Sequence, residues 1–184
     1  SVAVVASSDA LLYGGLVASR THAIPLPTLE ERAERLVQLK KSHAGQKVYV
    51  FATIMRSPKA SSAPVEPEYY AEWGPQIFRM GALEDKLELK EIKRSEVREL
   101  ADLRAKIPQE VQQDLYARRA DNIRATELLL HGVESGDFDY MLIGRDDTAA
   151  YSQAHREARN MDILVRELPR ERIRFFAGAD QLGL

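Results

Sequence analysis

The sequence predicts an α/β fold with a parallel sheet, crossover helices and a helical insertion between the second and third strands. Four short runs are rich in Val, Ile, Phe and Tyr, and amphipathic helical patterns separate them. Alternating strands and helices are typical of parallel sheets whose strands are joined by crossover helices. The runs largely lack alternation of apolar and polar residues, which predicts that both faces of the sheet are covered. The strand count leaves open whether the sheet is Rossmann-like or part of a barrel.

The predicted strands, and the helix between the first two, follow from these runs. The strands are VAVVAS from Val2, KVYVFATIM from Lys47, DYMLIG from Asp139 and RIRFFAG from Arg172. In the segment PTLEERAERLVQLKKSH, Thr28 is the predicted helix N-cap and Glu31 completes a capping box. The core-facing side chains predicted for this helix are those of Leu29, Ala33, Leu36, Val37 and Leu39.

Residues 57–135 form the predicted insertion, with two or three helices that project from the sheet. Its last helix begins near Pro108 and ends near Val133, and Gly136 separates this helix from the third strand. The segment YSQAHREARNMDILVREL is the predicted helix before the fourth strand. The loop from Ser57 to Glu66 is rich in Ser, Pro and Ala, so we expect it to be mobile and to act as a lid.

The composition limits the classes of function open to this chain. Its 184 residues, 45% of them apolar, suffice for one α/β domain or for a fragment of a larger protein. The net charge of −2 argues against nucleic acid as a partner, and no apolar run is long enough to predict a membrane span. Cysteine is absent, which excludes thiolate chemistry and fits a cytoplasmic location. Because the chain starts on a strand and stops where a helix should follow, we expect additional N- and C-terminal segments.

Charged residues follow all four predicted strands at their carboxyl ends. They are Asp9 after the first strand, Arg56 after the second, Arg145, Asp146 and Asp147 after the third, and Asp180 after the fourth. Because ligand sites of parallel sheets lie beyond the carboxyl ends of the strands, we expect these side chains to converge. A convergent carboxylate cluster is costly unless it binds a cation, is partly protonated or pairs with arginine. The sequence therefore predicts a functional site at this edge.

The segment SSDALLYGGLVASR supplies further candidates next to Asp9. Its two adjacent glycines allow close approach of the backbone to a ligand, and Asp9 would bind hydroxyl groups. The alternative is that Asp9 caps a short helix and the glycines only turn the chain. The substrate-binding candidates of this segment are Tyr13, Gly14, Gly15, Ser19 and Arg20.

The segment RDDTAAYSQAHRE contains the two adjacent acids. Asp147 or Thr148 is expected to cap the following helix, which explains one of the two acids. Asp146 is then expected to hold the substrate, near Arg145 or Arg20. His155 is interpreted either as a substrate-binding residue or as an ordinary histidine on a helix face.

Two further groups of residues have both a functional and a plain structural interpretation. Tyr70 and Trp73, from the segment YYAEWG, would stack on a sugar ring or form a small core beneath the loop. Arg118 and Asn122 lie four residues apart on one helical face, where Asn122 would bind substrate or both would be solvated. The sequence contains no GxGxxG, GxxxxGKS, GxSxG or HExxH motif, and its histidines lack the spacing of a zinc site.

Several of these stretches resemble one known family. The segments SSDALLYGGLVASR, EPEYYAEWG and LIGRDDTAAYSQAHRE, in this order, resemble bacterial proteins of domain-of-unknown-function family 4127. FFAGADQLGL resembles the family's strand that enters its next helix. The resemblance spans nearly the whole chain, and the family's proteins are longer, which implies that this chain is a fragment of one. It indicates which residues matter rather than what they do.

These observations lead to the hypothesis of a hydrolase whose substrate is a polar, sugar-like small molecule. Asp146 and Asp147 would act as a general acid/base pair or hold Mg²⁺ or Mn²⁺, with Arg145 keeping one acid ionised. Asp9 and Asp180 would bind hydroxyl groups or complete the metal site. The alternative is a non-catalytic domain that binds a sugar or polyol at the same edge. A third possibility is that the acids only cap helices.

Overall fold

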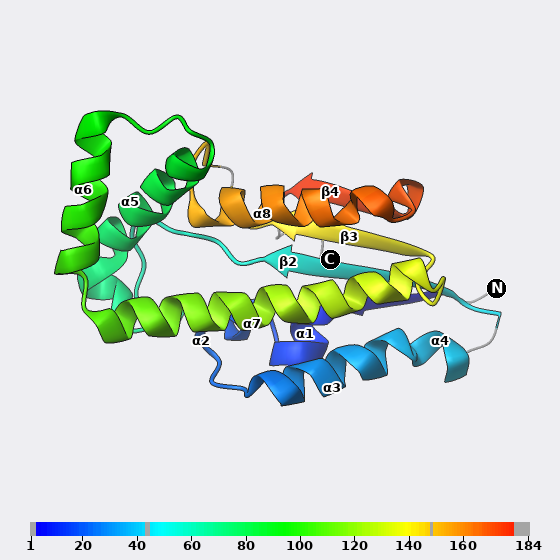
Figure 1. Cartoon of the computed structure of the whole chain (residues 1–184). Coiled ribbons are helices and arrows are strands. Elements are labelled where there is room, and N and C mark those ends of the chain that lie inside the picture. The colour runs from blue at the N-terminus through cyan, green and yellow to red at the C-terminus, as the bar shows by residue number, and fades with distance from the viewer. Residues whose placement is uncertain (1–2, 43–44, 148, 179–184) are drawn as a thin grey trace.

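The structure is built on a single parallel sheet whose strands lie in the order β1-β2-β3-β4 (Figure 1). It is a computed structural model, which describes residues 3–42, 45–147 and 149–178. The strands are β1 (Ala3–Ser7), β2 (Lys47–Ile54), β3 (Tyr140–Arg145) and β4 (Ile173–Ala177). All three neighbouring pairs are parallel, so the predicted arrangement is confirmed.

Helices connect each strand to the next. Between β1 and β2 lie α1 (Ser8–Tyr13), α2 (Ala18–Thr21), α3 (Leu26–Val37) and α4 (Leu39–Ser42). Between β2 and β3 lie α5 (Tyr70–Glu88), α6 (Arg94–Lys106) and α7 (Gln109–Glu134). Between β3 and β4 lie α8 (Gln153–Leu164) and the short 3-10 helices Val165–Glu167 and Arg170–Arg172.

The long helices of the three connections pack on the same face of the sheet. Leu29 of α3, Leu129 of α7 and Met161 of α8 belong to one core with Val48 and Val50 of β2. Along β2, buried and more exposed side chains alternate, as in a strand with one covered face. The expectation that both faces are covered is therefore wrong for the described chain.

The other face of the sheet is apolar as well, which is why the strand sequences lack a clear alternation. Val5 is 69% exposed, Tyr49 38% and Phe176 42%. A doubly wound Rossmann-like sheet carries helices on both faces, whereas a parallel barrel carries them on one. Sequential strand order with a single helical layer therefore agrees with the barrel alternative.

The insertion forms an arm of three helices beyond the carboxyl ends of the strands (Figure 1). It has a core of its own, which includes Met80 and Leu83 of α5, Leu100 of α6, and Val111 and Leu115 of α7. The later part of α7 leaves the arm and packs on the sheet, so α7 also serves as the crossover helix. The predicted helical insertion is therefore present, and its last helix joins the two cores.

Two predicted helix starts differ from the structure. The helix α3 begins at Leu26, and its N-cap is Pro25, three residues before the predicted N-cap Thr28. Pro27 lies in the first turn, where the missing N–H of proline costs nothing. The helix α8 begins at Gln153, and its N-cap is Ser152, whose hydroxyl accepts a hydrogen bond from the His155 N–H at 3.0 Å. The expectation that Asp147 or Thr148 caps α8 is therefore wrong, because Ser152 is the N-cap; Thr148 itself lies outside the described residues.

Gly132 of α7 packs directly against the ring of Phe138, which precedes β3. A Cβ atom at this position would lie 2.6 Å from two ring carbons of Phe138, which is fully buried. Gly132→Ala should therefore lower the free energy of unfolding by about 1–2 kcal/mol, since overpacking costs more than the gain in helix propensity. Urea unfolding measures the change, with Gly74→Ala as control because its nearest contact is a longer 3.3 Å. A G132A protein as stable as the control would contradict this account.

Candidate functional site

Asp9 lies at the carboxyl end of β1, in the first turn of α1. The hydroxyl of Ser7 accepts a hydrogen bond from the Ala10 N–H at 3.2 Å, which turns the chain directly after the strand. The Asp9 residue is 4% exposed, and its carboxylate accepts a hydrogen bond from the Thr53 hydroxyl on β2. Asp9 therefore faces the carboxyl end of the neighbouring strand rather than solvent.

Arg20 binds the acid that follows β3 and lies close enough to Asp9 to act on its charge. Its Nη2 lies 2.5 Å from Asp146 Oδ2, and its Nη1 lies 3.8 Å from Glu66 Oε1. Glu66 is 2% exposed and also accepts a hydrogen bond from Arg56 Nε at 2.7 Å. The residues Asp9, Arg20, Arg56, Glu66 and Asp146, called here the acid–arginine cluster, thus lie together although they come from distant segments of the chain.

A second buried ion pair holds the frame around this cluster. Arg119 of α7 is 2% exposed and binds Glu157 of α8 through Nε and Nη2, both at 2.7 Å. The same guanidinium donates hydrogen bonds to the carbonyl oxygens of Met55 at 2.7 Å and Arg56 at 3.0 Å. One side chain therefore connects α7, α8 and the end of β2, and fixes the backbone at Arg56.

Arg145 and Asp146 are adjacent at the end of β3, but their side chains point in different directions. Arg145 lines a cavity with His155 and Ala158 of α8, on the helix-covered side. Asp146 turns the other way and binds Arg20. The expectation that Arg145 keeps the neighbouring acid ionised is therefore wrong, because successive side chains of a strand point to opposite faces. Arg20 holds Asp146 instead, which was the other partner considered.

Burial and charge shift the proton affinity of two acids in the cluster. Burial, with the nearby charge of Asp146, raises the pKa of Asp9 from 3.8 to about 6, although Thr53 and Arg20 act against this rise. Burial also raises the pKa of Glu66, while Arg56 and Arg20 oppose the shift. Asp9 thus has the proton affinity of a group that can both take up and release a proton near neutral pH.

The family of the chain can be stated at this point. The family described as "Protein of unknown function (DUF4127)" matches residues 1–184. The chain belongs to this family. No curated protein and no solved structure matches it. No helix in the described part of this DUF4127 chain is long and apolar enough to cross a membrane.

The predicted binding residues between α1 and α2 have structural partners. Gly14 ends α1 with a left-handed φ of 97°, and the N–H of Gly15 bonds to the Asp9 carbonyl at 3.0 Å. Ser19 is buried, and its hydroxyl donates to the Leu16 carbonyl at 2.7 Å. These contacts build the turn that carries Arg20, so the glycines turn the chain as the alternative interpretation proposed.

Asn122 and Tyr13 support the same turn. Asn122 donates from Nδ2 to the Ser19 carbonyl at 2.8 Å, and its Oδ1 lies 2.8 Å from His22 Nε2. Tyr13 stacks on the His22 ring with centroids 4.9 Å apart. Asn122 is 8% exposed, so the interpretation of this residue as solvated is wrong. Through its hydrogen bond to the Ser19 carbonyl, Asn122 positions the backbone beside Arg20.

The aromatic pair lies in the core of the arm rather than in the acid–arginine cluster. Tyr70 is 2% exposed and Trp73 packs against the same core, which agrees with the interpretation of a small core beneath the loop. The loop itself is held at both ends. Ser57 accepts a hydrogen bond from the Ala154 N–H at 3.2 Å, and Glu66 belongs to the acid–arginine cluster. Residues 59–60 and 62–65 of the loop are exposed. The role of this loop as a mobile lid remains a prediction.

Asp147 takes a local structural role. Its Oδ1 accepts a hydrogen bond from the Ala149 N–H at 2.7 Å, which shapes the turn after β3. The true N-cap, Ser152, is fully buried. Ser152→Ala should therefore lower the free energy of unfolding by about 1 kcal/mol, the typical cost of a lost N-cap. Thermal unfolding beside Ser95→Ala, an exposed position in the first turn of α6, measures it. Equal stability of the two variants would show that the cap contributes nothing.

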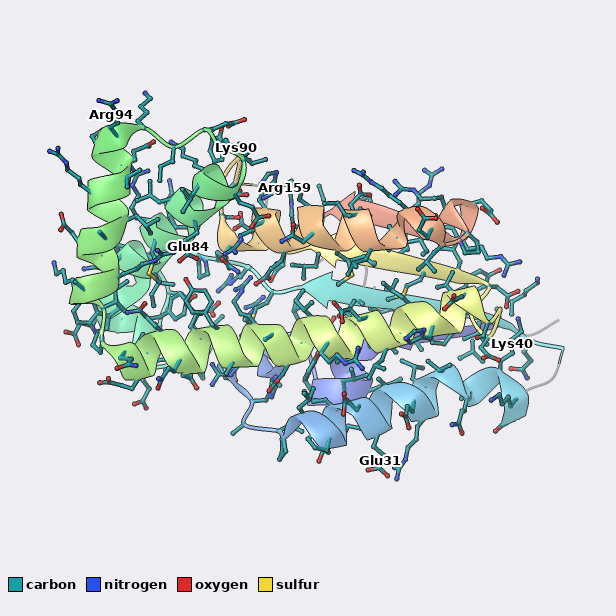
Figure 2. The ribbon with its side chains drawn as sticks, in the orientation of Figure 1. Glu31, Lys40, Glu84, Lys90, Arg94 and Arg159 are labelled. Atoms are coloured by element: carbon teal, nitrogen blue, oxygen red, sulfur yellow. The ribbon has the colours of Figure 1, made fainter. Side chains whose placement is uncertain are left out.

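His155 lies in the first turn of α8 and faces the arm. Its Nδ1 lies 2.5 Å from Oδ2 of Asp85, a fully buried residue of α5. Asp85 also accepts a hydrogen bond from Arg159 Nη2 at 2.9 Å. Figure 2 shows Glu84 of α5 and Arg159 of α8 on the two sides of this junction. His155 therefore has a defined partner, unlike an ordinary histidine on a helix face.

Sequence reasoning did not find four of the residues that matter here. Thr53 could have been found, because it lies near the end of β2 and its register partner on β3 is Gly144, two residues before Asp146. Glu66, Asp85 and Arg119 gave no local signal, since they come from a loop and from two helices of the insertion. Asp180 lies outside the described residues. Within the described ranges, no group of three or more His, Asp or Glu side chains could hold a metal ion.

Proposed function

We propose that the protein is a hydrolase that acts on a polar, hydroxyl-bearing small molecule at the carboxyl edge of the sheet. The observation that supports this most is the pairing of two acids in unequal environments. Asp9 is buried against Thr53 with a pKa of about 6, whereas Asp146 is bound to the Arg20 guanidinium at 2.5 Å. Two carboxyl groups in such different environments are typical of acid/base catalysis.

The two acids would divide the work. Ionised Asp9 takes a proton from the attacking water, and protonated Asp9 then returns that proton to the oxygen of the leaving group. Asp146 accepts hydrogen bonds from substrate hydroxyl groups, held in place by Arg20. This proposal replaces the pair Asp146 and Asp147 by the pair Asp9 and Asp146. The Mg²⁺ or Mn²⁺ site expected with Asp180 forms no part of it.

Turnover of nitrophenyl substrates tests the proposal. A panel of glycosides, esters and phosphate esters is assayed with the wild-type protein and with Asp9→Asn, which keeps the shape of the side chain and removes its proton exchange. We expect at least one substrate to be hydrolysed, with a rate that rises with pH through about 6 as Asp9 ionises, and D9N to lose about 100-fold or more in rate. Asp102→Asn, at an exposed position of α6, is the matched control. Equal rates in D9N and D102N would refute the role of Asp9.

Binding of a sugar or polyol without catalysis is the second candidate. It is favoured by the ion pairing of the cluster, in which Arg20 binds Asp146 and Arg56 binds Glu66, so that ionised acids and guanidinium groups are held in fixed positions. Thermal-shift measurements with a panel of sugars and polyols separate the two functions. Stabilisation by such ligands without turnover of the nitrophenyl panel would favour binding alone. Arg20→Gln should then remove the stabilisation, because Asp146 loses its partner.

A further inference from the structure

A second cavity lies on the other side of β3, away from the acid–arginine cluster. It has a volume of about 330 Å³ and lies between the end of β3, β4 and α8. Arg145, His155, Arg159 and Asp162 contribute polar or charged groups, and Ala158 and Phe175 contribute apolar walls. This combination of a few polar groups and apolar walls is common in small-molecule sites, and the volume is at the lower end of their range.

Arg145 is the positive charge of this cavity that has no ion-pair partner among the described residues. Its side chain is half-buried, and it forms no ion pair or side-chain hydrogen bond with any residue in the described ranges. By contrast, Arg159 is bound to Asp85 at 2.9 Å and to Glu88 at 3.0 Å. A guanidinium that is partly removed from water and left unpaired is unfavourable unless an anion joins it. The acid of the lining, Asp162, is already bound to Arg170 at 3.1 Å, so Arg145 remains the charge that an anion would join.

His155 presents its second nitrogen to the same cavity. A carboxylate such as Asp85 can only accept hydrogen bonds, so Nδ1 of His155 donates to it. The Ser152 N–H and Arg159 also bind Asp85, which fixes the carboxylate and through it the ring. The remaining nitrogen, Nε2, has no partner among the described residues, and the side chain is 27% exposed. On protonation Nε2 becomes a second donor for an anion.

We propose that this cavity binds the oxyanion group, phosphate or carboxylate, of a small molecule. Arg145 donates two parallel hydrogen bonds to the anion, and the protonated His155 Nε2 donates a third. Asp85 acts as a positioning residue that orients the histidine. The site is separate from the acid–arginine cluster, because Arg145 and Asp146 point to opposite sides of β3. The proposal of an anion site does not depend on the proposed hydrolase activity.

The ring proton resonances of histidine report binding directly. Inorganic phosphate and acetate are titrated separately into the protein at constant ionic strength with chloride, and the His155 signal is identified by its absence in His155→Gln. We expect a saturable shift of this signal at millimolar anion. Saturation with phosphate alone, or with acetate alone, identifies the oxyanion. If neither phosphate nor acetate shifts the His155 signal, the proposal is overturned.

Arg145→Gln should weaken the apparent affinity about tenfold or more, since it removes a charged two-point contact. Arg98→Gln, at an exposed position of α6, makes the same charge change and should leave the affinity as it was. Equal affinities in these two variants would overturn the assignment. If R145Q does not fold, Arg145→Lys replaces it. The lysine variant keeps the charge but cannot make the two parallel bonds, so it should bind more weakly than wild type, and unchanged affinity would again overturn the site.

Discussion

Replacing Arg119 by Met should lower the free energy of unfolding by about 3–5 kcal/mol, because it leaves a buried acid without its partner. Arg119 is 2% exposed, Glu157 is 11% exposed, and two hydrogen bonds of 2.7 Å join them. The substitution also removes both donors from the carbonyls of Met55 and Arg56. The effect should therefore be among the largest of any single substitution in the chain.

Urea unfolding measures this loss, and Arg98→Met on the exposed face of α6 is the matched control. The double variant Arg119→Met, Glu157→Leu should recover part of the loss, since it removes the unpaired carboxylate. A loss in R119M close to that of the control would mean that the pair contributes little. An R119M protein that loses stability without any recovery in the double variant would place the effect in the carbonyl contacts instead.

Asp9→Asn should make the protein more stable near neutral pH while it removes activity. The pKa of Asp9 is about 6 in the folded chain and 3.8 for an ordinary aspartate. Between these two pH values the folded state holds a proton that the unfolded state has lost, so the stability of the wild type falls as pH rises through this window. The difference approaches about 3 kcal/mol, at roughly 1.4 kcal/mol for each pKa unit. Asn does not titrate and avoids this loss.

The measurement compares the free energies of unfolding of wild type and D9N from pH 4 to 8. The stability difference should be small at the acid end and should grow to favour D9N as pH rises past about 6. Glu66, whose pKa is also raised, remains in both proteins and cancels in the comparison. A pH-independent difference would show that Asp9 titrates as an ordinary acid. A residue that costs stability and is needed for turnover is what a catalytic site predicts.

The sequence by itself determined the strands, their parallel arrangement and the edge at which the acids meet. These features depend on local patterns, because apolar runs separated by helices specify a parallel sheet and the carboxyl ends of its strands share one edge. Asp9 and Asp146 could therefore be placed near one another without coordinates. The helix from Gln109 to Glu134 was predicted almost to its ends for the same reason.

Only the tertiary structure decided which charges meet. Arg20 and Asp146 are separated by 126 residues, and Arg119 and Glu157 by 38, so no local pattern pairs them. Arg145 and Asp146 are neighbours in sequence, yet one faces α8 and the other Arg20. The N-cap at Ser152 and the burial of Tyr70 depend on how α5 packs against α8 and α7. Partner choice is set by packing across the fold, because ion pairs act over a few ångströms in space and not along the chain.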